Sequence, residues 1–230
     1  MNVRRGTARK ILLIAAAIAA MPPALLSGCE AGPSVQAMRS QGDRALDDRD
    51  YAAAAEWYEM YVSRRPIDPE VRYRLGTAYL GLKKPIRARE EFLQGLEMDN
   101  DVDRYIEGIA AALVETGQRE RLFGVLGEHA RNTRQPTDYI LFGKFAAIVG
   151  DPDTAEEAFL EAAKLDKGQT IPPQLALADF YGSLGDTDRE LQRLRMALFL
   201  DTANEVVNTR IRNLGEVSGP TFALMPAERQ

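Results

Sequence analysis

Apolar and small residues recur from residue 35 onwards at the three- and four-residue intervals of amphipathic α-helices. Short polar segments containing Gly, Pro or Asp separate these stretches and mark where each one begins or ends. Within residues 69–102, the pattern predicts one helix near Glu70–Gly81 and a second near Pro85–Met98. The chain is therefore expected to have an all-α fold made of paired antiparallel helices.

The helical pattern itself returns at intervals of 34 residues. Gly76 lies 34 residues after Gly42, and Phe92 lies 34 residues after Tyr58. A helix pair of this size cannot bury its apolar face alone, so neighbouring pairs must stack into one elongated domain, a solenoid. A constant frame starting at Val35 defines five units, namely 35–68, 69–102, 103–136, 137–170 and 171–204.

The chain continues beyond the fifth unit. Residues 205–214 form one more amphipathic helix, which we expect to cap the last apolar face. Residues 215–230 contain two glycines and two prolines and are typical of a tail. The apolar segment Thr221–Met225 is expected to fold back on the solenoid, because burying one large apolar side chain is worth about 2 kcal/mol. A role of this segment in binding a partner is the alternative.

The third unit departs from the pattern. Leu122 stands where a small residue is expected, and the second helix of this unit contains Gly124 and Gly127. Each glycine inside a helix costs about 1 kcal/mol relative to alanine. Two interpretations stay open, a harmless drift of the sequence and a flexible point midway along the solenoid. The fifth unit also departs, with Glu190 at a position where a small residue is expected.

The repeated spacing has a known counterpart. The arrangement Leu75-Gly76-x2-Tyr79, followed by Ala88-x3-Phe92, resembles the signature of the tetratricopeptide repeat. The resemblance covers nearly all of the chain after residue 34. It implies a solenoid of about five helix-turn-helix repeats with a C-terminal capping helix, and a protein that binds partners and is not an enzyme.

The resemblance also implies a binding surface. In this family the side chains that face the inner groove stand at positions 2, 5, 9 and 12 of the first helix of each repeat. An alternative for some of these positions is packing against a neighbouring repeat. The residues expected to line a protein-binding groove are Arg39, Asp43, Tyr73, Thr77, Leu80, Arg104, Glu107, Ile140 and Lys144.

The N-terminal segment has the features of a bacterial lipoprotein signal peptide, predicted over residues 1–28. A basic start is followed by the apolar run Ile11–Met21, which is too short to span a bilayer. The sequence Leu26-Ser27-Gly28-Cys29 resembles a lipobox, so Cys29 is expected to be lipidated and to begin a short linker at 29–34. The alternatives are an uncleaved anchor and an ordinary secretory signal. Cys29 is the only cysteine in the chain, which excludes an internal disulfide.

Composition narrows the range of partners. Removing residues 1–28 removes four of the 29 Lys and Arg and none of the 34 Asp and Glu, which leaves a net charge of −9. An acidic protein of this kind lacks the basic clusters that nucleic acid requires. We therefore expect no nucleic-acid partner. The resemblance to a lipobox implies a protein of the cell envelope that is held by lipid, and Glu30, in place of an Asp after the cysteine, favours the outer membrane, facing the periplasm.

The sequence shows no pattern typical of catalysis, and no cofactor, metal ion or small-molecule substrate is expected. His129 is the only histidine and is expected to be structural. The acidic segment Asp99–Asp103 resembles the start of a calcium loop, but Arg104 and Ala110 stand where glycine and glutamate are required. Acidic residues at a helix N-terminus explain this segment better.

Three functions fit these expectations. The first is an adaptor in the assembly of an envelope secretion or pilus machine, because the pilotin-like lipoproteins of type IV and Tad pili are similar in layout. The second is a subunit of the machinery that assembles outer-membrane β-barrels. The third is a regulatory partner of a cell-wall enzyme.

Overall fold

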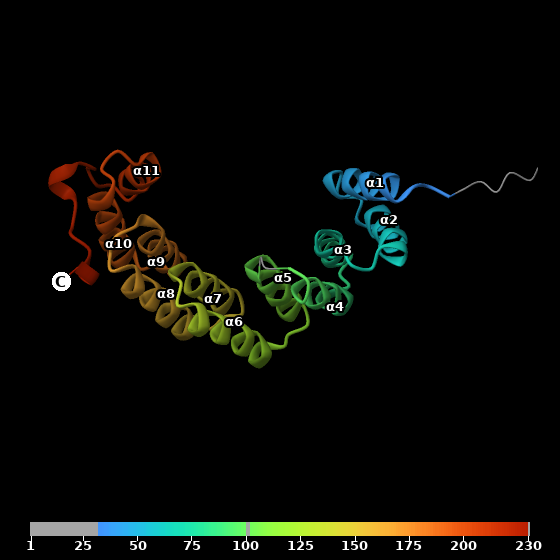
Figure 1. Ribbon diagram of the computed structural model, residues 1–230. Helices are drawn as coiled ribbons and strands as arrows, with labels where there is room; N and C mark the ends of the chain where they lie inside the picture. Colours follow the sequence, from blue (N-terminus) through green and yellow to red (C-terminus); the bar gives the residue numbers. More distant parts are fainter. Residues whose placement is uncertain (1–31, 100–101, 230) are drawn as a thin grey trace, which may run out of the picture. The chain divides into compact units, whose positions relative to one another are not determined.

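The structure, a computed structural model, describes residues 32–99 and 102–229, which contain α-helices and two short 3₁₀ helices but no β-strand (Figure 1). No helix in this part of the chain is long and apolar enough to cross a membrane. The predicted signal peptide and the lipidated Cys29 lie outside the described residues. The helices are α1 (Val35–Asp47), α2 (Tyr51–Arg64), α3 (Pro69–Gly81), α4 (Pro85–Leu96), α5 (Val102–Glu115), α6 (Arg119–Thr133), α7 (Pro136–Ile148), α8 (Pro152–Asp166), α9 (Ile171–Ser183), α10 (Thr187–Leu200), α11 (Glu205–Asn213), η1 (Pro220–Phe222) and η2 (Ala227–Arg229).

The ends of the helices are set by local chemistry. The side chains of Asp50, Asp68, Asp151 and Asp186 each accept a hydrogen bond from the backbone N–H three residues later. These bonds satisfy N–H groups that have no partner within the helix. Several helices also begin with proline, which fits the first turn because it has no N–H to satisfy.

The turn between the two helices of each unit has the same geometry throughout. One residue adopts a positive φ, and the N–H of the next residue donates to the carbonyl oxygen five residues earlier. The residues with positive φ in these turns are Arg49, Lys83, Gly117, Gly150 and Gly185.

The spacing of these turns is 34, 34, 33 and 35 residues. The turn of the fourth unit therefore lies one residue earlier than a constant frame predicts, at Gly150 and not at residue 151. The longer interval that follows restores the frame, so that α9 begins at Ile171.

The two helices of a unit approach each other closely where a glycine of the first faces an aromatic ring of the second. A Cβ atom added to Gly76 would lie 2.6 Å from Phe92, and Gly42 and Gly143 face the rings of Tyr58 and Phe159 in the same way. A ring can therefore pack directly on the backbone of the opposite helix.

The third unit has no such glycine and ring. Ala110 and Leu126 occupy the equivalent positions, and both are buried. The second helix, α6, nevertheless runs without interruption from Arg119 to Thr133, through both of its internal glycines.

The apolar core follows the order of the helices. Each helix packs on its neighbours in sequence, and the buried residues divide into three clusters. The first cluster draws on α1 to α6 with Phe145 of α7, the second on α7 to α9, and the third on α9 to α11.

The C-terminal tail packs on the last helices of the solenoid. Phe222 contacts the third core cluster, and the guanidinium of Arg195 lies 4.6 Å from the centre of its ring. Further along, Glu228 accepts hydrogen bonds from Arg193 at 2.6 Å and from Gln174 at 3.0 Å. These bonds attach the tail to α9 and α10, away from the residues expected to line the groove on α1, α3, α5 and α7.

Candidate protein-binding surface

Charged side chains link the first helices of the first three units. Arg74 of α3 contacts Asp43 of α1 at 3.1 Å and donates to Glu70 at 2.7 Å. Glu70 also accepts a hydrogen bond from Arg104 of α5 at 2.6 Å. Asp43 and Arg104, both expected to line the groove, are thus joined through Glu70, which is itself at position 2 of its repeat, and through Arg74, which the sequence alone did not single out.

This network shifts the acidity of its members. Burial alone would raise the pKa of Glu70, but hydrogen bonds from Arg74 and Arg104 outweigh it and hold the pKa below its usual value. Burial and the hydrogen bond to Asp43 raise the pKa of Tyr58. The groove in this region therefore has charges that are largely compensated within the protein.

An aromatic cluster lies beside the charged network. The ring of Tyr73 is 5.6 Å from that of Phe92 and 5.6 Å from that of Tyr105, measured between ring centres. The guanidinium of Arg104 lies 5.0 Å from the centre of the Tyr73 ring, within the range of a cation–π contact. Burial raises the pKa of Tyr105 to about 12, so its hydroxyl stays protonated and donates to the carbonyl oxygen of Pro69.

The other expected groove residues differ in their exposure. Arg39 lies 3.7 Å from Asp68, Thr77 donates to a carbonyl oxygen of its own helix, and Leu80 is half-buried. Glu107 and Lys144 are exposed.

Ile140 has a different environment from that expected of it. Only 9% of the residue is accessible, and it belongs to the second core cluster. Its apolar side chain is used for packing, the alternative that the sequence left open for such positions, and it offers little surface to a partner.

An apolar pocket of about 290 Å³ lies between α7 and α9, the first helices of the fourth and fifth units. Ile148 on its edge is 63% exposed, which is unusual for a large apolar side chain. The sequence identified Lys144 here, but it named no groove residue in the fifth unit and so missed the residues of α9. The lining residues are Lys144, Ala147, Ile148, Phe159, Ala176, Asp179, Phe180 and Ser183.

The two charged residues of the pocket have different surroundings. Lys144 and Asp179 occupy equivalent positions, each eight residues after the first residue of its helix. Asp179 already forms an ion pair with Arg210 of α11. Lys144 is exposed, so its ammonium group is accessible to a carboxylate of a bound protein.

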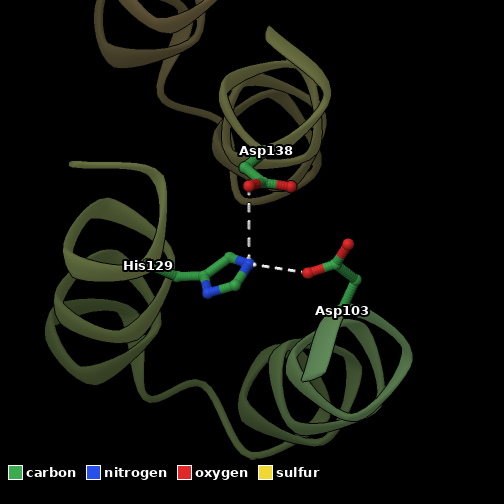
Figure 2. A group of neighbouring side chains, drawn as sticks. All are labelled: Asp103, His129 and Asp138. Atoms are coloured by element: carbon green, nitrogen blue, oxygen red, sulfur yellow. Dashed lines mark hydrogen bonds and ion pairs between the residues drawn. The ribbon is translucent and has the colours of Figure 1, made fainter. Parts of the chain in front are cut away.

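One group of side chains in the described part of the chain has a composition suited to a metal ion. Asp103, His129 and Asp138 bring their side chains together where α5, α6 and α7 meet, as Figure 2 shows. His129 is half-buried and contacts Asp103 at 3.1 Å.

Comparison with known proteins agrees with this architecture. The sequence model of the tetratricopeptide repeat matches residues 69–102. TTC0263, a thermophilic tetratricopeptide repeat protein of Thermus thermophilus, is 23% identical; the match covers 79% of this chain and 98% of that one, with a TM-score of 0.51. The comparison with curated proteins finds no match.

Two further solved structures share the fold. MamA of Desulfovibrio magneticus RS-1 is 19% identical over 74% of this chain and 97% of its own, with a TM-score of 0.52. PilW, described as a type IV pilus biogenesis factor, is 14% identical over 77% of this chain and 83% of its own, with a TM-score of 0.55.

The fold and the family match define the class of protein. The chain is an all-α solenoid of the tetratricopeptide repeat type, as the sequence predicted. Repeats of this kind stack into extended surfaces that bind other proteins, and proteins built from them are generally scaffolds without catalytic activity. A fold of this type suggests a protein-interaction scaffold.

Proposed function

We propose that this protein is a lipid-anchored scaffold of the bacterial envelope that binds a protein segment in its groove and supports assembly of a secretion or pilus machine. The observation that carries the binding part of the proposal is the apolar pocket between α7 and α9. Its volume of about 290 Å³ is at the small end of the range for ligand pockets, roughly 300–1,000 Å³.

A pocket of this size suits one bulky side chain of a partner better than a whole small molecule. Recognition of an extended or helical peptide commonly depends on one or two such apolar side chains seated in a groove. Ile148 and Phe180 supply the apolar walls, and Lys144 supplies a charge at the rim. The preferred segment therefore carries a large apolar residue with an acidic residue nearby.

The envelope location rests on the sequence of the N-terminus. The resemblance of Leu26–Cys29 to a lipobox supports lipidation of Cys29. Only five residues separate Cys29 from α1, which begins at Val35. At up to about 3.4 Å per residue they reach about 17 Å, so the partner is one that assembles close to the membrane surface.

The choice of a pilus or secretion machine draws on two observations of different kinds. The lipobox agrees with the layout of pilotin-like lipoproteins, and PilW, a pilus biogenesis factor by its description, has the same fold. At 14% identity the likeness to PilW concerns the fold, so the partner itself has to be captured. A β-barrel assembly component or a cell-wall enzyme among the captured proteins would favour the other two functions.

Site-specific photo-crosslinking in intact cells tests the proposal. A photoreactive residue is placed at Lys144 beside the pocket, at Tyr73 in the aromatic cluster and, as a control, at the exposed Glu90 on α4. We expect a pilus or secretion component to be captured from Lys144 or Tyr73 and not from Glu90. Capture of no protein from the groove positions, or equal capture from Glu90, would contradict binding in the groove.

A further inference from the structure

Three helices bring one imidazole and two carboxylates together at the junction of the third and fourth units (Figure 2). Asp103 lies in the first turn of α5, His129 near the end of α6 and Asp138 in the first turn of α7. The Nε2 atom of His129 lies 3.1 Å from Oδ1 of Asp103 and 3.6 Å from Oδ2 of Asp138. All three candidate ligand atoms lie within 4.8 Å of one another.

Both carboxylates occupy positions that favour negative charge, and Asp138 also accepts a hydrogen bond from α6. Each lies at a helix N-terminus, where the helix dipole favours negative charge. Asp138 is only 5% exposed, and the hydroxyl of Thr133 donates to its Oδ2 atom at 2.5 Å. This hydrogen bond fixes the orientation of a buried carboxylate toward His129, which is the usual role of a group in the outer shell of a metal site.

A proton on His129 does not satisfy both carboxylates. An Nε2–H group donates one good hydrogen bond, and at 3.1 Å Asp103 is the better acceptor. The oxygen of Asp138, at 3.6 Å, is beyond the range of a normal hydrogen bond to the same nitrogen. A cation between the three atoms would interact favourably with all of them.

The distances suit a small divalent cation. Bonds of about 2.0–2.2 Å in tetrahedral geometry place the ligand atoms of zinc roughly 3.3–3.6 Å apart. Of the observed separations, 3.1 Å lies slightly below this range and 3.6 Å at its upper end. A mixed set of imidazole nitrogen and carboxylate oxygen is one that Zn²⁺ accepts readily.

We propose that Asp103, His129 and Asp138 bind a divalent transition-metal ion, with Zn²⁺ as the reference cation. The side chain of Asp103 is 67% exposed, so water can reach the fourth coordination position. The ion links α5, α6 and α7, and thus the third unit to the fourth. The third unit lacks the packing of a ring on a glycine that the first, second and fourth units have, so the ion would add a link at this junction.

Titration calorimetry with zinc chloride tests the site on the full chain, purified in detergent and treated with a chelator beforehand. We expect one Zn²⁺ per chain, with affinity at least tenfold weaker in His129→Gln and in Asp103→Asn. Glu128→Gln is the matched control, because it removes an exposed acid beside His129 that is not part of the site. At about one hundred times the Kd, zinc should raise the Tm by roughly 5–10 °C.

Folding of the variants is followed by circular dichroism. Because Asp103 is largely exposed, its replacement should leave the fold intact even if that of His129 does not. Absence of saturable one-to-one binding would overturn the proposal. Binding of equal affinity in Asp103→Asn, His129→Gln and the parent chain would also overturn it, because the ion would then be held elsewhere.

Discussion

Arg104 donates a hydrogen bond to Glu70, the residue that occupies the equivalent position one repeat earlier, at a distance of 2.6 Å. Both side chains are partly shielded from water, with 26% and 32% of their surface exposed. The contact joins α3 to α5 directly, across the helix that lies between them in sequence. It is therefore a link between repeats and not within one.

Arg104→Ala should destabilise the protein by about 1–2 kcal/mol, since hydrogen bonds between charged, partly buried groups are worth more than exposed ones. Urea denaturation measures the change in the free energy of unfolding. The control is Lys83→Ala, which breaks the ion pair with Glu115. Because 73% of the lysine side chain is exposed, this change should lower the free energy of unfolding by less than about 0.5 kcal/mol. Equal effects of the two changes would show that the partly buried link adds no more than an exposed one.

Gly76→Ala should destabilise the protein by about 1–3 kcal/mol, because the new Cβ would lie 2.6 Å from the buried ring of Phe92. Gly124→Ala is the same substitution at another helical glycine, and it should have the opposite effect on stability. A Cβ there meets no atom within 4 Å, so the gain in helix propensity should stabilise α6 by up to about 1 kcal/mol. Thermal denaturation of the two variants should thus give shifts of opposite sign.

The attachment of the tail should weaken in acid. Burial would raise the pKa of Glu228, but the hydrogen bonds from Arg193 and Gln174 and one from the backbone hold it below the usual value. A carboxyl with a lowered pKa stabilises the folded state above the pKa of the unfolded chain, about 4.3, and loses this effect as the pH falls through the folded pKa.

Hydrogen exchange of the Leu224 amide, which donates to the carbonyl oxygen of Arg195, reports on this attachment. After correction for intrinsic rates, its protection should fall as the pH drops below about 4.3, the pKa of the unfolded chain. Glu228→Gln should reduce protection at neutral pH and remove this dependence. A dependence that persists in the variant would assign the effect to another group.

Ile148→Glu should weaken capture of the partner from Lys144 without changing stability. Ile148 lies at the edge of the pocket with 63% of its surface exposed, so the substitution affects binding and leaves the core intact. Ile86→Glu on α4 is the control, because Ile86 is similarly exposed, at 58%, but lies outside the pocket. Comparable loss of capture in both variants would point to a general effect of the added charge.

Cys29→Ala should prevent lipidation and leave the protein either uncleaved or released from the membrane. The measurement is metabolic labelling with a fatty acid, combined with fractionation of the envelope. Lipid attachment at the parent level in the variant would contradict the assignment of the lipobox.

The sequence predicted the helices and their class well because the signals that set them are local. Asp50, Asp68, Asp151 and Asp186 precede helices whose first turns they cap. The regular repetition of small and aromatic residues then identified the tetratricopeptide type of solenoid.

The sequence predicted the binding surface less completely, because the exposure of each surface residue depends on contacts between units. Ile140 and Lys144 stand one helical turn apart at expected groove positions, yet the first packs in the core and the second is exposed. The pocket draws on three helices, and its α9 residues belong to a unit for which the sequence named no groove residue.

The group around His129 was hidden for a similar reason. Its partners Asp103 and Asp138 lie 26 residues before it and nine residues after it, without the close spacing of a ligand motif. The sequence explained Asp103 by a helix N-terminus and did not single out Asp138, and only the stacking of the third unit on the fourth brings them to one imidazole.

The turns with positive φ have a consequence for how this chain tolerates changes in length. In every unit the turn residue lies nine positions before the residue at the ring position: Tyr58, Phe92, Leu126, Phe159 or Leu194. The intervals of 33 and 35 residues therefore arise only in the connections between helix pairs. Each helix pair is therefore a rigid packing unit. A residue can be inserted or deleted in the connection between two helix pairs without disturbing the packing within either pair.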